Sequence, residues 1–249
     1  MDVKSSFDSD PNQIDQICVA IRSYTANQRH AGILYRDSSD SIKLLHLGWH
    51  YDLGNDDFSN DFLWLDVPLN PINKMHMATV CEMFYEENKD GIPYGLAIDD
   101  SFIDQQGKFL PMEAHAGLTC ATFVMKLFHD QGLAFIDIDG WKHRLDDKTW
   151  QRQVMQILEH HTTDPKPSKE YLDYQNKRLN SGCARFRPEE IIAARHLPDF
   201  PYCAESVKEP AVELVSKVDE HFKKIKEQKH LNWLKEKGRQ SSQVSSNNT

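Results

Sequence analysis

The sequence predicts an α+β fold, in which a small antiparallel sheet packs on a helix and a helical extension follows at the C-terminal side. Two short apolar runs flank an Asp/Ser cluster at residues 37–40, as in a β-hairpin. An amphipathic segment begins at Cys120 and ends before Gly132. Beyond Gly132, charged segments with helical periodicity are separated by Pro, Gly and Asp.

The elements of the first half are expected in the following order. Residues 13–24 carry apolar side chains at helical spacing, so we expect the first element to be a helix. The hairpin strands are expected at residues 30–36 and 41–48, and a third strand at 61–67. Asn70 and Pro71 provide the cap and first turn of a helix that ends before Gly91. Short strands follow at 94–98 and 101–110.

The second half is predicted to be helical. After the Cys120 helix, helices are expected at residues 148–160, 168–179 and 188–195, with an exposed connection at 162–168. A highly charged last helix is expected from 209 to 238. We therefore divide the chain into a flexible N-terminus (1–10), a core (11–145), a helical extension packed on or appended to the core (146–238) and a disordered tail (239–249).

Composition excludes several classes of protein. The 249 residues include 39% hydrophobic ones, enough for a sizeable core, and the net charge of −9 argues against a general nucleic-acid binder. The chain has no apolar signal core and no apolar run of transmembrane length. We expect a cytoplasmic protein, or an effector exported without a signal peptide. Five widely spaced cysteines without a Cys-x-x-Cys pair indicate reduced thiols.

Cys120 is the candidate nucleophile. A thiol in the first turn of a helix faces unsatisfied backbone N–H groups and the positive end of the helix dipole, and both favour the reactive thiolate. The alternative is a buried structural cysteine, because free Cys packs as a small hydrophobe.

His30 and His46 are the candidate partners of this thiol. A thiol nucleophile needs a base, and the base needs a third group that orients it. If Arg36 pairs with Asp40 across the turn, His30 lies directly opposite His46, and a one-residue slip would put the two rings on opposite faces. His115 and Tyr94 are possible further members of the pocket.

The segments His30–Tyr35, Leu44–Leu47 and Thr119–Val124, in this order, resemble the permuted NlpC/P60 group of papain-like thiol hydrolases, which includes the lecithin:retinol acyltransferase-like proteins. The resemblance covers residues 28–130. It implies a permuted papain-like catalytic core within residues 11–145, with Cys120 as nucleophile, His30 as base and His46 as the orienting group. The sequence Thr-Cys-Ala-Thr replaces the Asn-Cys-Glu-His type of the lipid enzymes, which disfavours a lipid substrate.

The expected function is a cysteine-dependent hydrolase that cleaves an amide or peptide-like bond through a Cys-His-His triad and an acyl-enzyme. The oxyanion would be stabilised by the backbone N–H of Cys120 and by the adjoining turn at Thr119. No cofactor or metal is expected. Two alternatives stay open: a thiol acyltransferase or lipase acting on lipid esters, and a non-catalytic protein that binds a protein partner through its C-terminal helix.

Overall fold

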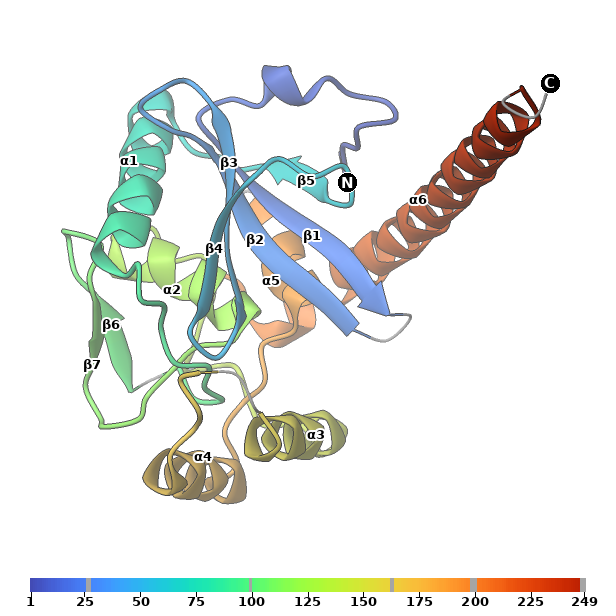
Figure 1. Cartoon of the computed structure of the whole chain (residues 1–249). Helices are drawn as coiled ribbons and strands as arrows, with labels where there is room; N and C mark the ends of the chain where they lie inside the picture. The colour runs from blue at the N-terminus through green and yellow to red at the C-terminus, as the bar shows by residue number, and fades with distance from the viewer. Residues whose placement is uncertain (26–27, 99, 162–163, 198–200, 247–249) are drawn as a thin grey trace.

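The computed structural model describes residues 1–25, 28–98, 100–161, 164–197 and 201–246, and side chains as far as residue 237. Over these residues the fold is α+β, with a five-stranded antiparallel sheet and six α-helices, the last of which is the long C-terminal helix (Figure 1). None of the described helices combines the length and the apolar character needed to cross a bilayer.

The sheet has the strand order β4-β3-β2-β1-β5. Its strands are β1 (Ile17–Thr25), β2 (Gln28–Arg36), β3 (Ile42–Trp49), β4 (Asp52–Asp57) and β5 (Leu63–Asp66). The predicted hairpin and third strand are therefore confirmed. The helix predicted over residues 13–24 is wrong, since most of it is β1. That strand pairs with β2 on one side and β5 on the other and is buried on both faces, so it reads as a continuous apolar run.

The hairpin register differs from the expected one by two residues. Arg36 pairs with Ile42 rather than with Asp40, and the ladder ends where Ile33 pairs with Leu45. A shift of two residues leaves each side chain on its original face, because side chains alternate with a period of two. His30 and His46 therefore still share a face, as diagonal neighbours instead of direct ones.

The helices of the first half begin and end near their predicted bounds. Helix α1 (Pro71–Glu87) starts after the Asn70 cap, and helix α2 (Cys120–Asp130) ends before Gly132. The buried face of α1 includes Cys81, whereas Ile72 in its first turn is exposed. The expected strand at 94–98 is absent from the described structure, where Tyr94 forms only an isolated bridge with Leu118. A small hairpin follows, formed by β6 (Ser101–Ile103) and β7 (Phe109–Pro111).

Four helices complete the chain: α3 (Asp147–Glu159), α4 (Lys169–Ser181), α5 (Pro188–His196) and α6 (Ala204–Ser246). Part of the expected connection at 162–168, residues 162 and 163, lies outside the described residues. Helix α6 begins earlier than expected and continues beyond residue 238 to Ser246, and it projects away from the rest of the molecule (Figure 1). Near the N-terminus, Lys4 forms an isolated antiparallel bridge with Trp64 of β5.

One hydrophobic core joins the sheet to the C-terminal helices. It includes residues of β1, β2 and β3 together with buried side chains of α1, α2, α5 and the first part of α6, as far as Val218. Helix α5 packs against β1, β2, β5 and α6. A second, smaller cluster covers the other sheet face and includes Cys18, Leu34 and Trp64. The helices after residue 146 thus share one core with the sheet.

Candidate active site

The N-terminus of α2 is held in place by its cap and by a close backbone crossing. Thr119 is the N-cap, and it forms a reciprocal capping box with Thr122. Just upstream, the segment at Gly95 passes so close to Gly117 that a Cβ on Gly95 would lie 2.6 Å from the Gly117 carbonyl group. Only glycine permits this approach. The local sequence therefore places Cys120 at the first helical position.

Of the two groups predicted to stabilise an oxyanion, the backbone N–H of Cys120 is the one that is not engaged in the helix cap. The Thr119 N–H donates to Oγ1 of Thr122 at 2.7 Å, and its hydroxyl accepts from the Thr122 N–H. Both groups of Thr119 are thus engaged in the cap. No hydrogen bond among the described residues uses the N–H of Cys120, as expected for the first turn of a helix.

Three residues form a hydrogen-bonded relay across β2, β3 and β4. Nε2 of His30 lies 2.9 Å from Nδ1 of His46, and Nε2 of His46 lies 2.9 Å from a carboxylate oxygen of Asp56. A carboxylate only accepts hydrogen bonds, so Nε2 of His46 carries a proton and donates it in the bond to Asp56. Nδ1 of His46 is then unprotonated and accepts the hydrogen bond that Nε2–H of His30 donates. His30 Nδ1 is then the unprotonated nitrogen, which is the form that a general base requires.

Cys120 and His30 line the same pocket. Its volume is about 60 Å³, and its walls include His30, Trp49, Tyr94, Cys120, Trp150, Arg185 and Glu189. The backbone N–H groups of Ala121 and of Ala31, the residue after His30, act on the Cys120 thiol and lower its pKa. No hydrogen bond joins the sulfur directly to His30 in the described part of the chain. The pair shares a pocket without being in hydrogen-bond contact.

Burial keeps both Cys120 and His30 neutral. Cys120 is 7% exposed, and desolvation raises the pKa of its thiol to about 11, although the N–H groups of Ala31 and Ala121 and the charge of Arg185 oppose the rise. Desolvation, followed by the neighbouring His46 and Arg22, lowers the pKa of His30 to about 3. The thiolate expected from the helix terminus is therefore not the resting form, because burial outweighs the helix dipole.

Tyr94 and His115, the two possible pocket residues, differ in their position relative to the pocket. Tyr94 lines the pocket, where its ring centroid lies 4.5 Å from that of Trp49. His115 is exposed and does not line it, and its ring lies 6.4 Å from those of Tyr171 and Tyr174. His115 therefore lies outside the lining of this pocket, because its spacing of five residues from Cys120 spans a turn and not a helix face.

Sequence reasoning missed Asp56 and the pocket wall formed after residue 146. Asp56 belongs to an Asp/Asn-rich segment whose composition is typical of a loop, yet it forms β4. Arg185 lies in the connection between α4 and α5, and Glu189 lies in the first turn of α5. No local sequence pattern indicates a site at either position. Only the tertiary packing brings them to Cys120.

A metal or a second cavity offers no competing centre on the residues that are described. No three His, Cys, Asp or Glu side chains among them are grouped as metal ligands. The Nδ1 atom of His50 accepts the Tyr94 N–H instead. A larger cavity of about 260 Å³ lies beyond Phe186, which lines both spaces, but neither Cys120 nor His30 reaches it.

No family model, no curated protein and no solved structure matches this chain. The class of site is therefore defined by its own residues: a cysteine at a helix N-terminus that shares a small pocket with the first histidine of a His-His-Asp relay.

Proposed function

We propose that this protein is a cysteine-dependent hydrolase of permuted papain-like design that cleaves an amide or peptide-like bond. Cys120 is the nucleophile, His30 the general base, and His46 and Asp56 the groups that orient and support it. The observation that carries the proposal is the relay from Asp56 through His46 to His30, which ends at the pocket that holds Cys120.

The proposed reaction proceeds through an acyl-enzyme. His30 Nδ1 takes the thiol proton while the Cys120 sulfur attacks the carbonyl carbon. The resulting oxyanion accepts a hydrogen bond from the backbone N–H of Cys120. His30 then gives its proton to the leaving amine as the C–N bond breaks. Water, deprotonated by His30, attacks the thioester, and the sulfur leaves and regains the proton. His30 acts as base and acid in turn.

The neutral resting pair is compatible with this sequence. Proton transfer occurs together with the attack, so that no free thiolate needs to accumulate before substrate is bound. When His30 becomes positively charged, its Nε2–H donates to His46, whose own proton donates to Asp56. The carboxylate charge stabilises the imidazolium through this chain of hydrogen bonds.

The size of the pocket favours a small or peptide-like acyl group over a lipid chain. Ligand pockets that enclose drug-sized molecules measure roughly 300–1,000 Å³, and the space beside Cys120 is about 60 Å³. Its walls include the aromatic rings of Trp49, Tyr94 and Trp150. Such a space accommodates the group next to a scissile bond while the remainder of the substrate stays outside.

Acyl-enzyme formation tests the proposal. The protein is incubated with a panel of p-nitrophenyl esters and anilides of short acyl groups and acylated amino acids, and adducts are located by peptide mass spectrometry. We expect acylation at Cys120, none in Cys120→Ser, and a rate about 10²-fold lower in His30→Ala. Cys203→Ser is the matched control, because this thiol is more accessible than that of Cys120 and does not line the pocket. Acylation that is confined to Cys203 would refute the proposal.

A non-catalytic interaction protein is the second candidate, and two observations favour it. Cys120 is protonated and buried at rest, as a packing residue would be. Helix α6 also exposes Leu231, Trp233 and Leu234. On this alternative, Cys120→Ala leaves partner binding intact and no acyl donor reacts, whereas the removal of residues 231–249 abolishes partner binding.

A further inference from the structure

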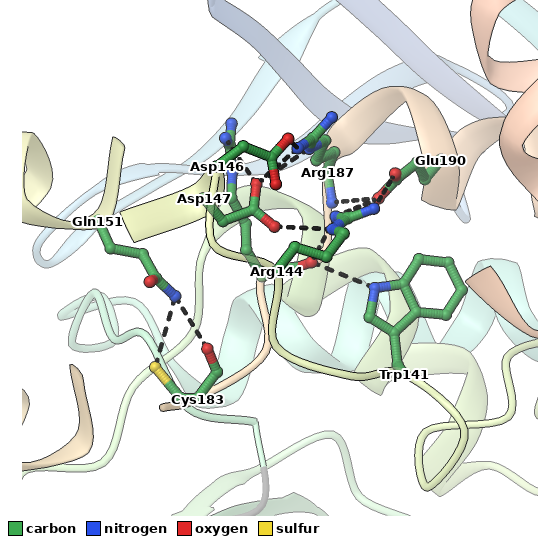
Figure 2. A network of polar contacts seen from close by, with 9 residues as sticks. Trp141, Arg144, Asp146, Asp147, Gln151, Cys183, Arg187 and Glu190 are labelled. Atoms are coloured by element: carbon green, nitrogen blue, oxygen red, sulfur yellow. Dashed lines mark hydrogen bonds and ion pairs between the residues drawn. The ribbon is translucent and has the colours of Figure 1, made fainter. Parts of the chain in front are cut away.

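The wall of the Cys120 pocket contains a cation that belongs to a buried ionic network. The network connects the start of α3 with the segment before α5, and its centre is Asp147, whose side chain is fully buried (Figure 2). Three guanidinium groups bind this one carboxylate, those of Arg144, Arg185 and Arg187. Because an unpaired buried charge is costly, each of these cations needs an opposite charge near it, either a carboxylate or an anion formed in the pocket.

Arg144 and Arg187 are compensated by carboxylates of their own. Arg144 bonds both oxygens of Glu190 and one oxygen of Asp147, at 2.8 Å. Arg187 binds Asp146 at 2.7 Å and the other oxygen of Asp147 at 2.8 Å.

Arg185 has the weakest compensation of the three. Within the described part of the chain, its ion pair is with the Asp147 oxygen that Arg187 already occupies, and at 3.3 Å it is the longest contact to that carboxylate. Its Nε is buried and has no hydrogen-bond partner among the described residues. The charge of Arg185 is therefore less closely paired with carboxylates than the charges of Arg144 and Arg187 are.

The surroundings of Arg185 are the Cys120 pocket. Arg185 lines it, and its guanidinium lies over the ring of Trp150, 3.9 Å from the ring centroid. Stacking on Trp150 and the bond to Asp147 together define its position. A fixed cation beside a buried group interacts more strongly with a nearby anion than it would in bulk water.

We propose that Arg185 is a positioning residue of this site, which Asp147 and Trp150 hold beside Cys120 so that its charge stabilises the anion formed there during reaction. That anion is the sulfur as it loses its proton. The inference rests on the proposed function in one respect, which is that Cys120 is the reacting group.

The other ionisable groups at the pocket do not supply this charge. His30 is held neutral by burial, and the Tyr94 hydroxyl carries no charge at neutral pH. Arg29 also lines the pocket, but it bonds both carboxylate oxygens of Asp219 at 3.0 and 3.1 Å. Glu189 has the opposite sign and disfavours a negative sulfur. Arg185 is the cation that remains.

Site-resolved alkylation of Cys120 tests the inference without a substrate. The rate with iodoacetamide is measured by peptide mass spectrometry, with Cys203 in the same sample as the internal standard. Below the pKa of the thiol this rate follows the thiolate fraction, so an upward shift of about one unit, the lower end of the effect of an adjacent opposite charge, slows it about tenfold. We expect this loss in Arg185→Gln and a near-normal rate in Arg185→Lys, which keeps the charge.

Arg29→Gln is the matched control, since it removes a cation that is already neutralised at the same pocket, and we expect its rate to be unchanged. A folded Arg185→Gln protein that is alkylated at the wild-type rate would overturn the inference. If circular dichroism shows that this variant does not fold, Glu189→Gln decides. Removal of the opposing charge must then accelerate alkylation severalfold, and an unchanged rate also overturns the inference.

The outcomes separate this inference from the proposed function. Normal acylation of Cys120 together with equal alkylation of Arg185→Gln and wild type would refute the role of Arg185 alone. A tenfold slower alkylation in Arg185→Gln, with no acylation by any donor, would leave the electrostatic role in place and refute the hydrolase.

Discussion

Single residues in this site are governed by the balance between burial and a few hydrogen bonds. His30 is 3% exposed and donates to a second imidazole, so it is held neutral in the folded protein, whereas it titrates near pH 6.5 when unfolded. The same neutrality that suits a general base has a consequence for stability. The unfolded chain takes up a proton on His30 at a higher pH than the folded chain does.

Acid should therefore destabilise the protein through His30. Because the folded pKa of about 3 lies below the ordinary 6.5, this contribution to stability is complete above pH 6.5 and declines as the pH falls towards 3. At about 1.4 kcal/mol per pH unit, the loss between pH 6.5 and pH 5 is about 2 kcal/mol. Urea unfolding at pH 7 and pH 5 measures it. We expect His30→Leu to lose about 2 kcal/mol less than wild type over this interval; equal losses would contradict the neutral, buried state of His30.

At the scale of elements, the pairing of β3 with β4 keeps the relay in line. Gly54 lies directly opposite His46, and a Cβ at Gly54 would lie 2.6 Å from Nε2 of His46, the atom that bonds Asp56. The absent side chain of Gly54 thus provides the space that the imidazole occupies. A methyl group there displaces the ring from Asp56.

Gly54→Ala should therefore impair catalysis more than folding. We expect the acylation rate to fall about tenfold, because His46 loses the partner that selects its tautomer, and stability to fall by about 1–3 kcal/mol from overpacking. Gly132→Ala is the control: its positive φ of 74° makes alanine unfavourable by about 1–2 kcal/mol, and nothing lies within 4 Å of the added methyl group. If both variants acylate equally, the relay does not depend on the position of His46.

The elements also show what local sequence signals could predict. Helices α1 and α2 were predictable because Asn70, Thr119 and Gly132 act on their own neighbours in the chain. Strand β1 was not, because burial on both faces removes the alternation that distinguishes a strand from a helix. The prediction that His30 and His46 lie on one face of the sheet agrees with the structure, because the error in register was an even number of residues. Asp56 and Arg185 were missed because only tertiary packing brings them to the site.

For the molecule as a whole, the boundary between the core and the projecting part lies within α6. Leu214 and Val218 are buried in the core that includes the sheet, and Ile225 is the last buried apolar residue among the side chains of this helix that are described, which end at residue 237. From His230 to Lys237 every described side chain is exposed. The two parts of one helix thus contribute very differently to stability.

Truncation should expose this difference. Removal of residues 231–249 should change the free energy of unfolding by no more than about 0.5 kcal/mol, because only exposed side chains of the described part are lost. Truncation after Glu213 removes Leu214, Val218 and Ile225 and should destabilise the protein by at least about 2–5 kcal/mol, the cost of one large core side chain. Urea unfolding of both proteins measures this. A large loss in the shorter truncation would place the end of α6 in the fold.

The participation of Trp150, Arg185 and Glu189 in the pocket wall has a consequence for the timing of synthesis. A ribosome releases the chain from its N-terminus, so the thiol and both imidazoles emerge well before these three residues. A nascent chain that ends near residue 140 carries Cys120 and His30 but not the wall that encloses them. The pocket is completed only when the segment after residue 146 has folded back, so a hydrolase of the proposed kind would become active only late in translation.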